Sequence, residues 1–208
     1  MPTKIDLKKN LNQLYLPSVK TPVIVEVPEM AFLMLDGRGN PNTSPDYQAA
    51  VEALYAVSYA LKFMSKKRLD RDYVVMPLEG LWWGTPLGQH SFSEGDKDQF
   101  IWTMMIMQPD FISAEMVAEA IEAVARKKGL ENLDALRFEC FAEGTSVQIL
   151  YRGPYDDEGP VVASMHQFAL EGGYRLSGKH HEIYLSDPRR TAPEKLKTVL
   201  RQPLEKQA

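Results

Sequence analysis

The sequence predicts an α+β protein made of two similar halves. Short runs rich in β-branched and aromatic residues alternate with longer segments whose apolar residues recur every three or four positions, which are the patterns of strands and amphipathic helices. Residues 32–35 align with residues 147–150, and at the same spacing Pro45 aligns with Pro160. Each copy has a strand, a Gly/Pro turn, a helix opened by proline and another strand. Two such units would pack as pseudo-symmetric halves with a groove where their antiparallel sheets meet.

Composition and charge place the chain among ordinary soluble globular proteins. Of its 208 residues, 44% are hydrophobic and 25% are charged, a balance that excludes a disordered chain. No window of about 18 residues lacks charge, which excludes a transmembrane helix. The formal net charge of −4 offers no basic surplus for binding nucleic acid. The single Cys140 and the lack of a signal-peptide core in residues 1–20 predict cytoplasmic localisation.

Turn and capping residues delimit the elements expected in the first half. Pro28 interrupts the first strand. The following helix begins with Ser44 as N-cap and Pro45 at its first position. The expected elements are a strand over 23–35, a helix over 46–66 and two β-rich runs over 73–83 and 100–107, with a loop over 84–97 between these runs.

Capping residues also delimit two helices in the second half. Ser113 is placed as an N-cap, and Gly129 follows two lysines as the C-terminal glycine of that helix. Pro160 opens the next helix, which Gly172 ends. Strands are expected over residues 136–141, 146–151 and 179–185.

The end of the chain is interpreted as a helix. Thr191 and Glu194 have the spacing of a capping box. Leu196, Val199 and Leu200 follow at helical spacing. The strand over 179–185 is therefore expected to be the last strand of the chain.

No standard catalytic or metal-binding signature is present. The histidines lack chelating spacing, and the adjacent His180 and His181 point to opposite faces of a strand. Residues 37–39 lack the third glycine of a dinucleotide fingerprint and are interpreted as a tight turn. The acidic run 156–158 has the wrong spacing for calcium and is assigned to charge complementarity at a helix N-terminus. We therefore expect no metal and no cofactor.

Glu182 is the candidate functional residue with the strongest local signal. It lies in the middle of a predicted strand, where Glu is rare, and Tyr184 shares its face two residues on. If that face is buried, the carboxylate needs a partner or a ligand. If the face is exposed, Glu182 only solubilises the sheet. The strand pattern leaves both alternatives open.

Aromatic residues on or beside predicted strands favour the buried alternative. Aromatic faces around one carboxylate suit a planar apolar guest or a delocalised cation. Tyr155 lies on a turn before a helix, where a role in the core is harder to assign. The candidate ligand-binding residues are Glu182 and the aromatic residues Trp82, Trp83, Trp102, Tyr151, Tyr155 and Tyr184.

Three segments, 78–83, 102–109 and 181–190, resemble the stand-alone branch of the GyrI-like small-molecule-binding family. This resemblance implies two strand-helix-strand-strand modules related by a pseudo-two-fold axis, with the ligand groove between their antiparallel sheets. It also implies an acidic residue on the last strand that meets cationic drugs in an aromatic pocket, a position that Glu182 matches. The expected organisation is a lead-in over residues 1–20 and a single domain over 21–208, with modules spanning about 21–110 and 111–208.

The resemblance extends to hydrolases of the stand-alone branch, which open the cyclopropane ring of yatakemycin-type DNA-alkylating compounds. In that reaction, stacking aromatics would orient the flat dienone. Tyr155 would donate to the carbonyl oxygen, and Glu182 would take a proton from the attacking water. Glu182 and Tyr155 are thus the candidate catalytic residues.

The sequence therefore predicts a cytoplasmic protein that captures hydrophobic, planar or cationic xenobiotics in an aromatic groove with Glu182 at its floor. Hydrolysis of cyclopropanoid compounds is an additional activity in this interpretation. The expected partner is a small molecule, with no nucleic acid and no membrane, because nothing in residues 1–20 resembles the DNA-binding domain of regulatory relatives. The alternative is a protein-binding module that shields DNA gyrase from inhibitors, for which the acidic run 156–158 is the hint.

Overall fold

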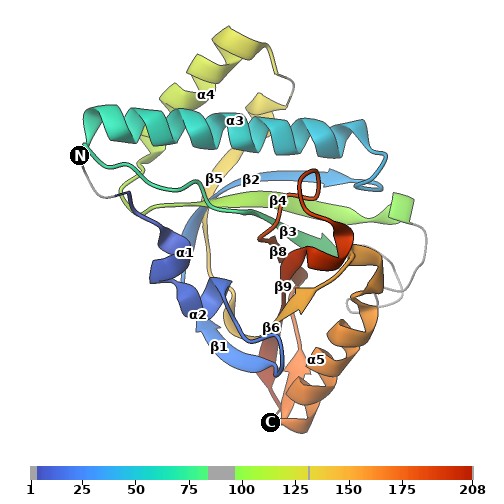
Figure 1. Ribbon diagram of the computed structural model, residues 1–208. Helices are drawn as coiled ribbons and strands as arrows, with labels where there is room; N and C mark the ends of the chain where they lie inside the picture. The colour runs from blue at the N-terminus through green and yellow to red at the C-terminus, as the bar shows by residue number, and fades with distance from the viewer. Residues whose placement is uncertain (1–3, 84–96, 131, 208) are drawn as a thin grey trace.

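A computed structural model describes residues 4–83, 97–130 and 132–207. Within these residues the chain forms a nine-stranded sheet and five α-helices (Figure 1). The helices are α1 (Leu7–Asn10), α2 (Asn12–Tyr15), α3 (Pro45–Arg68), α4 (Ala114–Lys128) and α5 (Gly159–Glu171). The strands are β1 (Val23–Val27), β2 (Met30–Arg38), β3 (Leu78–Trp83), β4 (Ile101–Gln108), β5 (Arg137–Phe141), β6 (Gly144–Arg152), β7 (Tyr174–Leu176), β8 (His180–Tyr184) and β9 (Lys197–Lys206). Of the loop expected over 84–97, residues 84–96 lie outside the described residues.

The order of strands shows the predicted two-fold organisation. The sheet runs β1-β6-β9-β8-β3-β4-β2-β5, with β7 paired to β9, and its strand pairs are antiparallel. β6-β9-β8 of the second half mirrors β2-β4-β3 of the first half, and β8 pairs with β3 at the centre. β1 pairs with β6, whereas β5 pairs with β2, so each half lends its first strand to the other. The α+β class is confirmed, and the two halves share one continuous sheet.

The helix starts follow from the predicted caps. The Ser44 side chain accepts a hydrogen bond from the backbone N–H of Tyr47, and Ser113 does the same for Met116. Each cap satisfies one of the free N–H groups at the start of a helix. Gly129 ends α4 in the left-handed conformation (φ +59°), as a C-terminal glycine does. No helix in the described ranges has the length and apolar character needed to cross a membrane.

Helices α3 and α5 lie on the same face of the sheet. The Gln108 side chain on β4 donates to Ser58 Oγ on α3 at 3.2 Å. Val162 on α5 packs in a buried cluster with Leu200 on β9. Gln108 and Leu200 point to the same side in the sheet register, which is also the side of Glu182, because Leu200 lies directly opposite Glu182. The central strands β3 and β8 therefore present Glu182 on the face that carries both helices.

The predicted terminal helix is wrong, because residues 197–206 form β9. This strand lies between β6 and β8 and is hydrogen-bonded to both. Residues 198–204 are buried on both faces, so the alternation of a half-exposed strand is missing and the spacing of Leu196, Val199 and Leu200 fits a helix equally well. The strand over 179–185, found as β8, is consequently not the last strand.

Strand boundaries differ from the predictions at two further places. In the run 73–83, the strand begins only at Leu78, and Tyr73 forms an isolated bridge with Ile5 of the N-terminal segment. The strand expected over 23–35 is divided into β1 and β2 around Pro28, the residue at which the interruption was predicted. This division allows β1 to leave its own half of the sheet and pair with β6.

Candidate functional site

Two buried carboxyl groups meet on the helix-covered face of the sheet. Glu182 lies in the middle of β8 and is 5% exposed, so the alternative of a solvent-exposed Glu182 is wrong. Glu158 precedes the first residue of α5 and is 8% exposed. A carboxylate oxygen of each residue lies within 4.8 Å of the other. The first turn of α5 thus brings a second acid to the central strand.

Burial and mutual repulsion change the ionisation of this pair. Burial raises the pKa of Glu158 to about 10, and the nearby charge of Glu182 adds to the rise. Burial also raises the pKa of Glu182, although hydrogen bonds with Tyr184 and Glu158 oppose the rise. Two buried carboxylates this close do not both ionise readily. The pair therefore resists full ionisation, and a cationic guest would stabilise its charged form.

His180 is the third polar residue of this cluster. It lies two residues before Glu182 on β8 and therefore on the same face. Its Nε2 atom is 3.7 Å from Glu182 Oε1. Burial lowers the pKa of His180 to about 3, so its imidazole is neutral at physiological pH. A neutral imidazole beside two carboxyl groups can accept a hydrogen bond or bind a metal cation.

Aromatic side chains surround the carboxyl pair. Trp82 Nε1 donates to the Tyr184 hydroxyl at 3.0 Å, and Tyr184 is in turn hydrogen-bonded to Glu182. The Tyr47 ring stacks on Trp82 with centroids 6.2 Å apart, and the Tyr155 ring meets Tyr184 edge-on at 5.7 Å. Burial, followed by the charge of Glu182, raises the pKa of Tyr155 to about 12, so its hydroxyl keeps its proton. These rings supply stacking surfaces and hydroxyl donors around the carboxyl pair.

A tight turn holds Tyr155 and Glu158 in place at the start of α5. The Tyr151 hydroxyl donates to the carbonyl oxygen of Pro154 at 2.8 Å. Gly153 has φ +154°, and a Cβ atom there would lie 2.4 Å from the Tyr151 hydroxyl oxygen. Only glycine leaves room for this hydrogen bond. Tyr151 therefore positions the segment that carries the site residues.

Of the aromatic residues predicted for the site, the structure brings Trp82, Tyr155 and Tyr184 together with Glu182. Trp83 follows Trp82 on β3 and faces the other side of the sheet, where Lys179 Nζ lies 3.2 Å from its ring centroid. The two other residues, Trp102 and Tyr151, are buried in the core: Trp102 packs edge-on beneath Tyr47 at 5.3 Å, and Tyr151 packs in the cluster under α5.

The sequence analysis did not identify Glu158, His180 and Tyr47 as site residues. Glu158 was assigned to the N-terminal charge of α5, yet its carboxyl group turns inward to Glu182. Tyr47 lies in the helix expected over 46–66 and was assigned no role in the site. A signal for Glu158 existed in its position three residues after Tyr155 and two residues before Pro160, which opens the helix. Nothing in the local sequence indicates that Tyr47 reaches Trp82.

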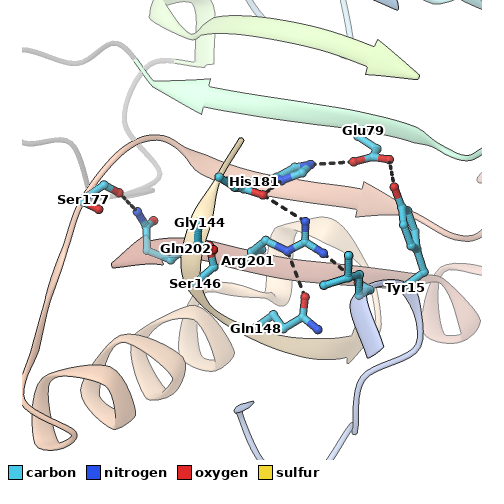
Figure 2. A network of polar contacts seen from close by, with 11 residues as sticks. Tyr15, Glu79, Gly144, Ser146, Gln148, Ser177, His181, Arg201 and Gln202 are labelled. Carbon is cyan, nitrogen blue, oxygen red and sulfur yellow. Dashed lines mark hydrogen bonds and ion pairs between the residues drawn. The ribbon is translucent and has the colours of Figure 1, made fainter. Parts of the chain in front are cut away.

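A second polar network lies on the opposite face of the central strands (Figure 2). His181 Nε2 is 3.0 Å from Glu79 Oε2, and His181 Nδ1 is 3.0 Å from both carboxylate oxygens of Glu143. Arg201 donates to Glu143 at 3.0 Å, and the Tyr15 hydroxyl donates to Glu79 at 2.8 Å. His180 and His181 thus serve opposite faces, as predicted. This network joins the N-terminal segment to β3, β8 and β9.

Charge pairing sets the ionisation of this network. Burial alone would lower the pKa of His181, but Glu143 outweighs it, with a further contribution from Glu79, and raises the pKa to about 9. Burial would raise the pKa of Glu143, but His181 and Arg201 outweigh it and lower the pKa to about 2. His181 is therefore a buried cation at neutral pH. Its ion pairs support the sheet directly behind Glu182.

Comparisons with known proteins agree with this architecture. A model of the GyrI-like small molecule binding domain matches residues 20–205. A crystal structure of an uncharacterized conserved protein from Listeria innocua is 44% identical, with a TM-score of 0.88, and the match covers 97% of this chain and 100% of that chain. A crystal structure of a hydrolase from Listeria innocua is 43% identical, with a TM-score of 0.85 and the same coverage. No curated protein matches the chain.

A more distant match shows how widely the fold is used. The EcmrR C-terminal domain is 14% identical to this chain, with a TM-score of 0.52, and the match covers 90% of this chain and 98% of that chain. At this identity the likeness concerns the fold alone.

Proposed function

Because the chain belongs to the GyrI-like small-molecule-binding domain family, we propose that it captures hydrophobic, planar or cationic xenobiotics against the helix-covered face of β3 and β8. The observation that carries this proposal is Glu182, a buried carboxyl group next to Glu158, with Tyr155 and Tyr184 beside it. A buried carboxylate is stabilised by a cation or by hydrogen-bond donors. Aromatic rings attract flat apolar surfaces and delocalised cations.

The preference for cations follows from the charge of the carboxyl pair. Burial raises the pKa of both Glu158 and Glu182, so a negative charge on this pair lacks compensation in the buried environment. A cationic guest would compensate this charge, whereas an anionic guest would be repelled by it. A neutral planar guest would depend on stacking against the rings alone. We therefore expect planar cations to bind more tightly than neutral compounds of the same shape.

The test of this proposal is a crystal structure of the protein soaked with N-methylacridinium, a planar cation. We expect its ring to stack against Tyr155 or Trp82 and its charged nitrogen to lie over the carboxyl pair. A titration of the same compound in solution gives the stoichiometry, which should be one per chain. A complex in which N-methylacridinium binds away from Glu182 would contradict the proposal.

Hydrolysis of cyclopropanoid compounds is a second proposed function, supported by the protonated Tyr155 beside the acids and by the 43% identical Listeria innocua hydrolase. The oxygen of water would form a bond to the cyclopropane CH₂. The ring C–C bond would break, and its electron pair would convert the dienone to a phenolate, which then takes up a proton from solvent to give the phenol. The ionised carboxylate of the pair, assigned to Glu182, would take the proton from water. Tyr155 would donate a hydrogen bond to the carbonyl oxygen as negative charge grows there.

The test of the hydrolase activity is incubation with a yatakemycin-type compound, followed by mass spectrometry. Turnover should give a ring-opened phenol that has gained one water, in amounts that exceed the protein. Stoichiometric capture of the unchanged compound would contradict hydrolysis while leaving ligand capture in place.

The structure gives less support to a protein-binding module that shields DNA gyrase. This alternative depended on the acidic run 156–158 as an exposed binding surface. In the structure Glu158 is buried, and Asp156 forms an ion pair with Lys97 at 2.7 Å. A gyrase pull-down tests this alternative, which requires a complex whether or not an inhibitor is present.

A further inference from the structure

Three side chains that can each supply a metal ligand converge at the carboxyl pair. They are Glu158, His180 and Glu182, and one ligand atom of each lies within 4.8 Å of the others. All three residues are buried. His180 and Glu182 come from one face of β8, and Glu158 approaches them from the start of α5. Because the three residues lie on a strand and at the start of a helix, regular secondary structure fixes their positions.

A separate observation indicates a missing partner at this place. The Oε2 atom of Glu158 is buried and has no hydrogen-bond partner among the described residues. Leaving a buried carboxylate oxygen without a partner is unfavourable, so such atoms normally face a donor or a cation. The residue is 8% exposed, and its carboxyl group is directed at Glu182 and His180. A bound cation would satisfy this oxygen.

The charge and the ligand atoms of these three side chains indicate which class of metal ion they would bind. A bound metal ion displaces the protons of its carboxyl ligands. The two carboxylates and the neutral imidazole then carry a charge of −2, which a divalent cation compensates. An imidazole together with carboxylates suits a first-row transition metal such as Zn²⁺, whereas Mg²⁺ and Ca²⁺ prefer oxygen ligands alone. We propose that Glu158, His180 and Glu182 bind one divalent transition-metal ion, with water in the remaining coordination positions. Three protein ligands and an open position are the arrangement of catalytic zinc sites.

Neighbouring side chains support this ligand set. Gln202 is hydrogen-bonded to His180, and Tyr184 is hydrogen-bonded to Glu182. Partners of this kind orient metal ligands in known sites. An organic cation and the metal ion would compete for the same two carboxylates. The metal site nevertheless stands apart from xenobiotic capture, since each can be measured with the other ligand absent.

The experiment is a Co²⁺ titration of the chelator-treated protein, followed by visible absorption, with Zn²⁺ as competitor. We expect one Co²⁺ per chain and displacement by Zn²⁺. Glu158→Gln and His180→Gln should each weaken binding on the order of tenfold to a hundredfold or more, as metal sites lose affinity when their ligand shells are altered. Glu194→Gln, which makes the same carboxyl-to-amide change at an exposed position, should bind Co²⁺ as the wild type does.

Equal Co²⁺ affinity in the wild type, Glu158→Gln and His180→Gln would overturn the proposal. If a variant fails to fold, the anomalous signal of zinc in wild-type crystals decides the question. A peak between Glu158, His180 and Glu182 supports the site, and peaks confined to other residues overturn it. Capture of N-methylacridinium by chelator-treated protein is measured separately, so failure of the metal site and failure of the proposed function are distinguishable.

Discussion

Gly80 on β3 lies directly opposite Glu182 on β8. A Cβ atom at Gly80 would lie 2.5 Å from Met104 Cε and 2.7 Å from Trp82 Nε1. The absence of a side chain therefore leaves the room in which Trp82 folds over its own strand and donates to Tyr184. A glycine at the centre of the sheet thus shapes the aromatic surroundings of the carboxyl pair.

Gly80→Ala should disturb this arrangement. An added methyl group in a packed core costs about 1–3 kcal/mol, and here it would push Trp82 away from Tyr184. We expect a lower free energy of unfolding in urea and weaker binding of N-methylacridinium. Gly159→Ala is the matched control, because a Cβ there meets nothing within 4 Å. Wild-type stability and affinity in Gly80→Ala would contradict this role of Gly80.

Tyr155→Phe should separate catalysis from capture. The change removes the hydroxyl group but keeps the ring that contacts Tyr184 edge-on. If Tyr155 stabilises the developing oxyanion, kcat for ring opening should fall about 10²- to 10³-fold, while N-methylacridinium binds almost as before. Steady-state turnover and a binding titration on the same preparation measure both effects. Unchanged turnover would remove Tyr155 from the proposed mechanism.

The ion pairs of His181 should make stability fall at alkaline pH. Its folded pKa of about 9 exceeds the ordinary value of 6.5, so its protonation contributes fully to stability below about pH 6.5, and this contribution is lost as the pH rises through 9. His181→Gln removes one of the two buried cations that pair with Glu143, the other being Arg201, and should cost about 3–5 kcal/mol at neutral pH. Its free energy of unfolding should also change less than that of the wild type between pH 6.5 and 9. Parallel profiles for the two proteins would refute this assignment.

Tyr15→Phe should loosen the N-terminal segment. The Tyr15 hydroxyl donates to Glu79 at 2.8 Å, and both side chains are fully buried. Loss of this hydrogen bond leaves a buried carboxylate oxygen short of a donor, at a cost of about 1–3 kcal/mol. Tyr59→Phe, at a position 48% exposed, should change the free energy of unfolding little. Amide exchange around residues 7–15 should increase in Tyr15→Phe alone.

The sequence predicted the elements whose signals are local. Ser44 and Ser113 cap their helices through contacts three residues away, so the sequence alone places both helix starts. β9 was assigned incorrectly because it is defined by pairing with β6 and β8, and these strand pairings leave no signal in the local spacing of its apolar residues. The exchange of β1 and β5 between the halves depends in the same way on pairing that no local pattern records.

The candidate site was predictable to a similar extent. Glu182 and Tyr184 share a face because side chains alternate along a strand, and this was evident from the sequence. The same alternation separates Trp82 from Trp83, although both were assigned to the site. Glu158 reaches Glu182 only because α5 packs on this face of the sheet. Tyr47 reaches Trp82 only because α3 packs on the same face. Helix packing of this kind is decided by the whole core.

The most direct test of the central claim compares Glu182→Gln with the wild type for two ligands of one shape. The ligands are the cation N-methylacridinium and neutral acridine, at a pH where acridine is unprotonated. We expect Glu182→Gln to weaken the binding of N-methylacridinium by about 1–3 kcal/mol, as for a lost hydrogen bond or ion pair to a charged group, and to change the binding of acridine little. Glu194→Gln should alter the binding of neither ligand. Equal weakening of both ligands in Glu182→Gln would contradict the electrostatic role of Glu182.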